Sequence, residues 1–365
     1  MRIGIDTSAL FLSRAGTATY IRGLLKGFQT LSKKTEIIQL FYIPRFDRHN
    51  RYLRIYDTIK RELIWMQERL PKEAVRKSCE IIHGPAMMSP IRCQLPIVLT
   101  IFDLYIVRNK QSFPFWPRTF MNYILPKIIN SSSRIIAISQ FTKQEILDLF
   151  PKIPESKIMV TPLGVDPIFN KVLKEATLPV KSKYGLVKPF IITVSTIEPR
   201  KNFENLLRSY ALVKNYLEHD LVVVGSYGWK STDIMTLIHQ LKLEQRVKYM
   251  GYVDKTDLPA LYSAADIFVY PSLYEGFGLP PLEAMACGCP IITSNCSSLP
   301  EVVGDAAMLI NPTDIEQLSQ ALKKLAGDVS KKELLRVASL KRAQAFSWDK
   351  CAQMTIRAYE QAIGL

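Results

Sequence analysis

A stretch of nine residues, Glu275-Gly-Phe-Gly-Leu-Pro-Pro-Leu-Glu283, has a carboxylate at each end of a glycine-rich turn. The prolines predict that a helix begins here, because the first helical turn leaves N–H groups without partners and proline has none. Gly276 and Gly278 allow the backbone to approach a ligand closely, and the helix dipole favours an anion such as phosphate. Carboxylates repel phosphate and accept hydrogen bonds, so we expect them to hold hydroxyl groups. The segment therefore predicts a ligand with a phosphate in the middle and hydroxyl groups at both ends, as in a nucleotide sugar.

Two adjacent cations, Arg200 and Lys201, lie between a predicted buried strand that ends near Ser195 and a predicted helix. Arginine can bind a diphosphate through two parallel hydrogen bonds, and lysine acts as a mobile point charge. The alternative is a basic helix start that faces solvent. Cations at a helix N-terminus oppose the dipole unless an anion is present. The pair therefore favours diphosphate binding, with Ser195 as a further contact.

Three other segments follow predicted strands and could contact the same ligand. Gly16 and Thr17 open a helix and would offer backbone N–H groups, although one glycine before a helix is often only a turn. Asp103 could bind an acceptor or stabilise a developing sugar cation, and it could equally cap the next segment. The turn at Tyr252 and Val253 could hold a nucleobase through backbone contacts.

Metal ligation and nucleophilic catalysis are not indicated. No His, Asp and Glu residues have metal-ligand spacing, and a lone histidine such as His83 is more often structural. The six cysteines lack zinc-like spacing and suit reduced thiols in a cytosolic protein. Nothing resembles a Ser-His-Asp or Cys-His arrangement. We expect no metal site and no cofactor.

The elements that must position these residues alternate between short apolar strands and helical stretches, as in α/β proteins with parallel sheets. A chain of 365 residues exceeds the usual size of one core. We predict two Rossmann-like domains, 1–166 and 189–347, joined by a linker at 167–188, with a terminal helix at 348–365 that can pack on the first. Ligands of such sheets bind at the carboxyl ends of the strands, which predicts a cleft between the domains. The expected strands are 2–5, 37–42, 81–83, 97–101, 135–138, 157–160, 190–195, 221–225, 247–250, 267–270 and 290–293.

The net charge of +15 is uneven, because residues up to 175 carry 27 Lys and Arg against 14 Asp and Glu. Residues 44–77 hold ten basic and five acidic side chains together with Tyr52, Tyr56 and Trp65. Basic residues interleaved with aromatic ones suit an anionic membrane surface, and a solvated helix face is the alternative. Nucleic acid ranks last, because no nucleic-acid motif accompanies the charge. The N-terminus becomes polar too soon for a signal peptide, and no apolar run could span a bilayer.

Taken together, these segments resemble the retaining glycosyltransferases of family 4, which have the two-Rossmann GT-B fold. Glu275 and Glu283 match the family's Glu-x7-Glu motif. The resemblance implies that Glu275 contacts the hydroxyls of the donor sugar and that Glu283 holds the ribose. It also implies that Arg200 and Lys201 stabilise the leaving diphosphate. The amides that would receive the sugar and diphosphate are those of Gly276, Phe277, Gly278 and Leu279.

Two positions depart from the family pattern. Many relatives have His-Asp where this chain has Phe102 and Asp103, and many have Gly-x-Gly where it has Gly16 and Ala18. These departures concern the acceptor side of the site. They leave open a degenerate protein that binds nucleotide sugars without turnover. A GT-B-fold sugar-nucleotide epimerase is the other alternative, although it would need acid and base residues that this chain does not offer in a motif.

The resemblance implies a donor that is a nucleotide diphosphate sugar, with GDP-mannose expected and a UDP-sugar as the alternative. The reaction would proceed by front-face attack, with the leaving phosphate taking the acceptor's proton. We expect the acceptor to be a saccharide or a lipid-linked saccharide of polysaccharide or O-antigen type. The protein would then be cytoplasmic and peripheral at the inner face of the cell membrane.

Overall fold

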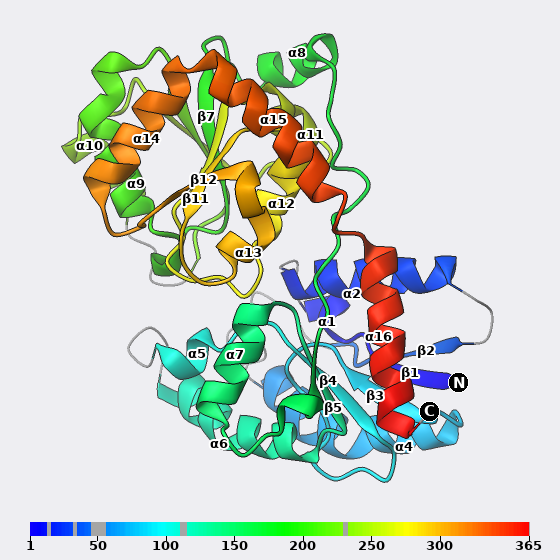
Figure 1. Cartoon of the computed structure of the whole chain (residues 1–365). Helices are drawn as coiled ribbons and strands as arrows, with labels where there is room; N and C mark the ends of the chain where they lie inside the picture. Colours follow the sequence, from blue (N-terminus) through cyan, green and yellow to red (C-terminus); the bar gives the residue numbers. More distant parts are fainter. Residues whose placement is uncertain (13–15, 32–34, 45–55, 110–114, 229–232, 365) are drawn as a thin grey trace. The chain divides into compact units, whose positions relative to one another are not determined.

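The computed structural model describes the chain except for residues 13–15, 32–34, 45–55, 110–114, 229–232 and 365. It divides into two compact units (Figure 1), of which the first comprises Met1–Gly164 with Ser347–Leu365 and the second Val165–Phe346. A linker was expected at residues 167–188. These residues belong to the second unit and include helix α8 (Lys174–Lys183), which packs against α11 (Leu258–Ala264).

The first unit is built on a parallel sheet of six strands in the order β2-β1-β3-β4-β5-β6. All five residues of β4 are buried apolar or hydroxyl side chains, as expected for a strand covered on both faces. Its strands are β1 (Arg2–Asp6), β2 (Glu36–Leu40), β3 (Ile81–Gly84), β4 (Ile97–Ile101), β5 (Arg134–Ala137) and β6 (Ile158–Val160). The helices between them are α1 (Ala9–Leu12), α2 (Gly16–Thr30), η1 (Lys60–Arg69), α4 (Leu70–Arg76), α5 (Tyr105–Arg108), α6 (Phe115–Ser131), α7 (Gln140–Leu149) and η2 (Glu155–Lys157).

The last helix, α16 (Trp348–Ile363), returns to this first unit and packs against α2, β4 and β5. Figure 1 shows it in red, at the end of the chain. Glycines on α2 allow the close approach, since a Cβ at Gly23 would lie 2.1 Å from Cε2 of Trp348. Beneath α16, the ring nitrogens of His83 lie 2.8 Å from Thr100 Oγ1 and 2.7 Å from Tyr359 Oη. Burial lowers the pKa of His83 to about 3, so this histidine is neutral and has a structural role.

The second unit has a parallel sheet in the order β12-β11-β10-β7-β8-β9, and both sheets confirm the predicted α/β class. Strand β12 was not predicted. The strands are β7 (Phe190–Val194), β8 (Asp220–Val224), β9 (Val247–Gly251), β10 (Ile267–Tyr270), β11 (Ile291–Ser294) and β12 (Ala307–Ile310). The remaining helices are η3 (Pro199–Lys201), α9 (Phe203–Val213), η4 (Lys214–Tyr216), α10 (Ile234–Gln240), α12 (Leu279–Ala286), α13 (Leu299–Val303), η5 (Gly304–Ala306), α14 (Ile315–Gly327) and α15 (Val329–Ala343).

The sheet order brings together segments that are far apart in the sequence. Strands β7 and β10 are neighbours, with Ile191 paired to Ile267 and Ile192 to Phe268. Because they run parallel, the segments that follow them leave the sheet at the same edge. These segments carry Arg200 and Lys201 after β7, and Glu275 after β10.

No helix in the part of the chain that the structure describes is both long enough and apolar enough to cross a membrane.

Candidate active site

A buried ion pair between Lys201 and Glu275 lies at the centre of the candidate site. Each side chain is only 8% exposed, and the ammonium donates to Glu275 Oε1. The hydroxyl of Tyr270 lies 2.8 Å from Lys201 Nζ and 2.9 Å from Glu275 Oε1. Ser272 Oγ donates to the same carboxylate oxygen at 2.7 Å. The structure thus joins two residues that are 74 positions apart in the sequence.

Arg200 lies beside this pair and is less buried, with 23% of its side chain exposed. Its guanidinium is paired with Glu198, and its Nη1 lies 3.6 Å from Glu275 Oε2. The carboxylate of Glu275 therefore has one oxygen held by Lys201, Tyr270 and Ser272, and a second oxygen that faces Arg200.

The electrostatics of the pair favour its charged form. Burial raises the pKa of Glu275, but Lys201 and Arg200 outweigh burial and hold that pKa below its ordinary value. Burial lowers the pKa of Lys201, and the carboxylate of Glu275 opposes that shift. Burial also raises the pKa of Tyr270 well above its ordinary value, so its hydroxyl keeps its proton.

Asn202 holds the turn that carries the two cations. Its backbone is left-handed, with φ of 59°, a conformation that asparagine tolerates better than most residues. Its side-chain amide donates to the carbonyls of Pro271 at 3.1 Å and Pro312 at 2.6 Å. The carbonyl of Arg200 accepts from the amide of Leu273 at 2.7 Å. These bonds tie the turn after β7 to the turn after β10.

The glycine-rich turn enters α12 as predicted. Gly278 precedes the helix with φ of 111°, and a Cβ there would lie 2.8 Å from Leu299 Cδ2. Glycine is required for both reasons. Ser298 Oγ lies 2.9 Å from the carbonyl of Glu275 and 2.8 Å from that of Phe277, which fixes the turn.

Glu283 lies on α12 and is partly buried, with Tyr262 Oη 3.4 Å from its Oε2. Burial raises the pKa of Glu283 to about 8, although Lys255 lowers it. Lys255 is in turn paired with Asp166 at 2.6 Å. The second carboxylate of the predicted motif therefore differs from the first, because it lacks a buried cation in direct contact among the described residues.

The other predicted contacts of the second unit lie on turns after neighbouring strands. Ser195 follows β7, and its buried hydroxyl has no hydrogen-bond partner among the described residues. Tyr252 and Val253 follow β9; the first is 67% exposed and the second is buried. Gly225 follows β8, the strand between β7 and β9, and a Cβ there would come within 1.8 Å of the carbonyl of Ser195. The ring of Tyr252 is therefore accessible to a ligand, whereas the hydroxyl of Ser195 is buried.

The predicted contacts of the first unit are Gly16, Thr17 and Asp103. Gly16 and Thr17 form the first turn of α2. Asp103 Oδ1 accepts a hydrogen bond from the amide of Tyr105 at 3.1 Å, so Asp103 contacts the first residue of α5. That contact supports the structural alternative for Asp103. Phe102 packs edge-on against Tyr20, with ring centroids 5.2 Å apart.

Several site residues were missed by the sequence reasoning, namely Tyr270, Ser272, Asn202 and Gly225. Tyr270 looks like an ordinary core residue at the end of an apolar strand. Its position five residues before Glu275 was the available signal, because the last residue of a parallel strand lies next to the ligand edge.

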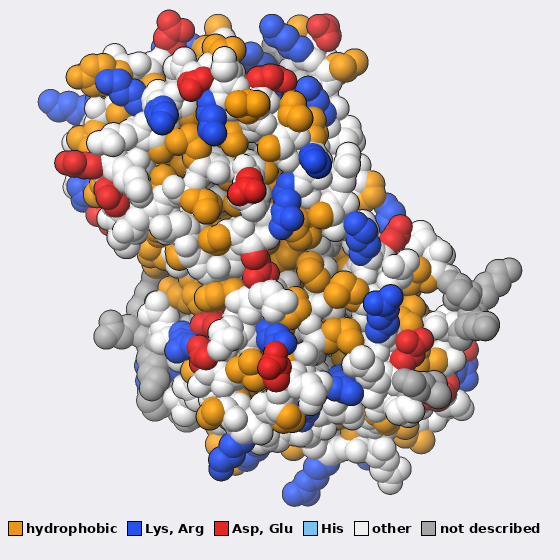
Figure 2. All heavy atoms as spheres, in the orientation of Figure 1, with side chains coloured by type: hydrophobic (Ala, Val, Ile, Leu, Met, Phe, Trp, Pro, Cys, Tyr) orange, Lys and Arg blue, Asp and Glu red, His pale blue; other side chains and the backbone are white. Residues whose placement is uncertain are grey.

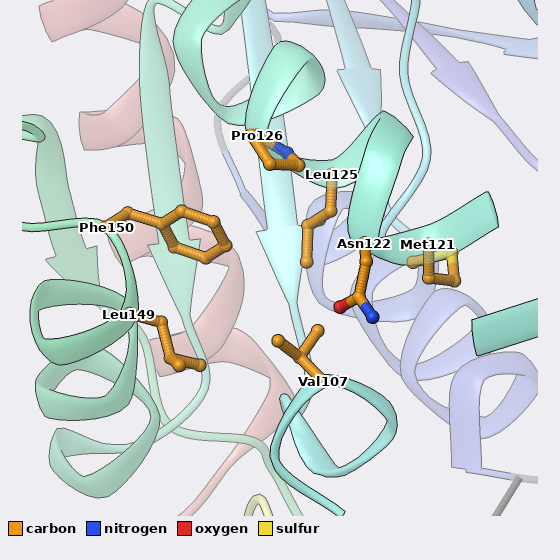
Figure 3. Close-up of a pocket in the computed structure, with 7 residues that line it drawn as sticks. All are labelled: Val107, Met121, Asn122, Leu125, Pro126, Leu149 and Phe150. Atoms are coloured by element: carbon orange, nitrogen blue, oxygen red, sulfur yellow. The ribbon is translucent and has the colours of Figure 1, made fainter. Parts of the chain in front are cut away.

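Two small pockets lie within single units. In the first unit, a pocket of about 100 Å³ lies between α5, α6 and α7, with Asn122 as its one amide among apolar neighbours (Figure 3). Its lining residues are Val107, Met121, Asn122, Leu125, Pro126, Leu149 and Phe150. In the second unit, a pocket of about 140 Å³ adjoins the turn of Glu198 and Asn202. Among the described residues, no group of three or more His, Cys, Asp or Glu could hold a metal ion.

The basic segment 44–77 is described only from residue 56 onward, apart from Pro44, so Tyr52 lies outside the described residues. Tyr56, Ile59 and Leu63 are each about half exposed, at 53%, 52% and 48%. They recur at helical spacing and share the segment with Arg69, Lys72 and Arg76, which are exposed. Elsewhere, on the face drawn in Figure 2, Lys and Arg side chains are interspersed with Asp and Glu.

Comparison with known proteins gives two family matches that together span most of the chain. The family described as Glycosyltransferase Family 4 matches residues 15–169, and the one described as Glycosyl transferases group 1 matches residues 177–339. The chain is 36% identical over 283 residues to O-antigen chain mannosyltransferase B of Escherichia coli, which covers 77% of this chain and 74% of that protein. It is 30% identical over 276 residues to the serotype-specific mannosyltransferase WbdA of Escherichia coli, covering 73% of this chain but only 33% of WbdA.

Solved structures share the fold at low identity. Anabaena HepE in complex with UDP-glucose matches with a TM-score of 0.77 and 17% identity, over 100% of both chains. Sucrose-phosphate synthase from Thermosynechococcus elongatus matches with a TM-score of 0.77 and 19% identity, over 99% of this chain and 98% of that one.

Proposed function

The chain belongs to glycosyltransferase family 4 and has the GT-B fold, and from this premise we propose that it is a retaining mannosyltransferase. The donor would be GDP-mannose and the acceptor a saccharide or lipid-linked saccharide in O-antigen-type glycan synthesis. The observation that carries the proposal is the arrangement of Lys201 and Arg200 around Glu275, beside the N-terminus of α12.

This arrangement suits a ligand with a diphosphate next to a sugar. The N-terminus of α12 offers backbone N–H groups and a positive dipole end. Arg200 and Lys201 add two positive charges at the same edge of the sheet, and Glu275 Oε2 can accept hydrogen bonds from sugar hydroxyls. Glu283, at the other end of the motif, would accept from the ribose hydroxyls.

The chemistry asks for stabilisation of a leaving anion. The bond between the anomeric carbon and the diphosphate oxygen breaks, and its electron pair stays on the diphosphate. The acceptor oxygen forms the new bond to the anomeric carbon on the same face, and its proton passes to the departing phosphate oxygen. Preorganised positive charge near that oxygen is commonly the largest catalytic contribution, and here Arg200 and Lys201 would supply it without a metal ion.

Mannose is favoured as the transferred sugar because both relatives described above are mannosyltransferases. HepE, which shares the fold alone, was solved with UDP-glucose. A UDP-sugar is therefore the second candidate donor. Stabilisation by GDP but not by UDP in a thermal-unfolding assay would support GDP-mannose as the donor. A ligand raises stability according to its affinity for the folded state.

The function is tested by incubating the protein with radiolabelled GDP-mannose, UDP-glucose and UDP-galactose, with and without a lipid-linked saccharide acceptor. Transfer or slow hydrolysis of GDP-mannose is expected, and proton NMR of the product should show the anomeric configuration of the donor. An inverted product would contradict the retaining mechanism. Binding of a donor with neither transfer nor hydrolysis would favour the degenerate binding protein, and interconversion of free nucleotide sugars would favour the epimerase.

The membrane surface is the partner we propose for the first unit. The half-exposed Tyr56, Ile59 and Leu63 would enter the interfacial layer, and the neighbouring cations would contact anionic headgroups. Such docking would bring a lipid-linked acceptor to the protein at the inner face of the cell membrane.

A further inference from the structure

The hydroxyl of Tyr270 connects the two charged partners of the candidate site. Tyr270 is the last residue of β10 and is 2% exposed. An ammonium group can only donate hydrogen bonds and an ionised carboxylate can only accept them. Tyr270 Oη must therefore accept from Lys201 at 2.8 Å and donate to Glu275 Oε1 at 2.9 Å. Its single proton is committed, so the direction of both bonds is defined.

The ring of Tyr270 has a separate role in packing. It stacks on Phe268, with centroids 5.7 Å apart and an interplanar angle of 19°. A phenylalanine at position 270 would keep this contact. The hydroxyl can therefore be removed without opening a cavity the size of the ring.

We propose that Tyr270 is a positioning residue for the transfer reaction, whose hydroxyl keeps the ammonium of Lys201 charged and fixed at the edge where the diphosphate binds. The same hydroxyl occupies Glu275 Oε1 and leaves Oε2 for the sugar. The inference rests on the proposed function, because it assigns Tyr270 no contact with the substrate and acts only through Lys201 and Glu275.

The test is the variant Tyr270→Phe. The charged groups around Lys201 are Glu275, Arg200 and Glu198, and the titratable hydroxyl of Tyr270 is hydrogen-bonded to it. Loss of the Tyr270 oxygen removes a neutral acceptor from the buried ammonium, which should lower the pKa of Lys201 further. Titration of ¹³C-labelled lysine by NMR would follow Lys201, whose signal is assigned by its disappearance in Lys201→Arg.

Turnover of GDP-mannose by Tyr270→Phe should be slower than in the wild type. We expect kcat to fall roughly tenfold, less than the hundred- to thousandfold loss typical of removing a direct charge-stabilising donor. The donor KM should stay within about twofold, since an interaction made in the transition state affects kcat and not ground-state binding. The alkaline limb of the kcat profile should move to lower pH, an effect that a purely structural residue would not produce.

Tyr210→Phe is the matched control. Tyr210 is a fully buried tyrosine of the same unit, and its hydroxyl donates to the carbonyl of His219 at 2.7 Å. It should change stability by a similar amount and leave both kcat and the pKa of Lys201 unchanged. Tyr270→Phe keeps the ring that stacks on Phe268, so we expect it to fold, and circular dichroism would verify this.

The double variant Tyr270→Phe with Lys201→Ala tests whether the effect of Tyr270 depends on Lys201. The fall in its kcat should be smaller than the product of the two single falls, because Tyr270 acts in part through Lys201. An unchanged Lys201 pKa and near-wild-type turnover in Tyr270→Phe, with Lys201→Ala impaired, would overturn this inference alone. Full turnover in Lys201→Ala would overturn the role of Lys201 in the proposed function and the inference with it.

Discussion

Tyr262 and Glu283 face each other on neighbouring helices, with Tyr262 Oη 3.4 Å from Glu283 Oε2. This contact is long, and burial raises the pKa of Glu283 to about 8. Below that pH the carboxyl group is mostly protonated in the ligand-free protein. Hydroxyl groups of a ribose would bind the ionised form better, because a carboxylate is the stronger acceptor.

Nucleotide binding should therefore release a proton at Glu283. The affinity for GDP should rise with pH, by up to about tenfold per pH unit as one proton is released, and level off above about pH 8. Isothermal titration calorimetry from pH 6 to 9 would measure this, with Glu283→Gln as the control that should flatten the dependence. An affinity that falls over the same range in the wild type would contradict the ribose role.

Removing either cation should slow the transfer. Arg200→Ala and Lys201→Ala are each expected to lower kcat by about a hundred- to a thousandfold, the range for loss of one direct charge-stabilising donor. Steady-state kinetics with the labelled donor would measure the effect. Arg208→Ala is the control, since Arg208 is exposed and paired with Glu204 on α9. Turnover near wild type in both site variants would refute the assignment.

The close approach of α16 to α2 should make Gly23 sensitive to any side chain. A Cβ at Gly23 would lie 2.1 Å from the buried indole of Trp348. We expect Gly23→Ala to lower the free energy of unfolding by about 1 to 3 kcal/mol, the usual cost of overpacking. Gly327→Ala is the matched control, because a Cβ there has no atom within 4 Å. Urea denaturation would compare them, and equal effects would argue against the contact.

Membrane docking predicts that Leu63→Asp weakens binding to vesicles that contain anionic lipid. Leu63 is 48% exposed on a segment rich in cations. Leu178→Asp is the control, since Leu178 is 54% exposed on α8 of the other unit and should have no effect. Binding should fall as salt increases, because salt screens exposed charges. Sedimentation with vesicles would measure both, and binding insensitive to salt and to anionic lipid content would contradict the proposal.

Much of the fold could be predicted because its strands are short apolar runs between polar turns. The expected strands match β1 to β11, and the α/β class is confirmed. Strand β12 (Ala307–Ile310) was not expected; it lies at the edge of its sheet, and its Leu309 is exposed. The segment 167–188 looked like a linker because it is rich in lysine, yet Lys183 pairs with Asp257 at 2.7 Å and helps hold α8 on the second unit.

In the candidate site, too, the sequence could identify some residues and not others. Glu275, Gly278 and Glu283 could be identified from spacing alone, because a turn and the helix that follows it are local structures. The sequence could not decide between a binding role and a structural role for Asp103, because its contact with the amide of Tyr105 depends on the conformation of one turn. The catalytic and binding roles of the site residues stay predictions.

The sequence by itself determined where the strands, turns and helix starts lie, because these depend on local preferences and on the period of apolar residues. It also determined the membership of the family through motifs of fixed spacing. Only the tertiary structure decided that β7 pairs with β10, since strand pairing across 76 residues leaves no local signal. That pairing buries Lys201 against Glu275 and Tyr270. Lys201 and Arg200 then outweigh burial and hold the pKa of Glu275 below its ordinary value. The returning α16 is a further product of long-range packing, made possible by the absent side chain of Gly23.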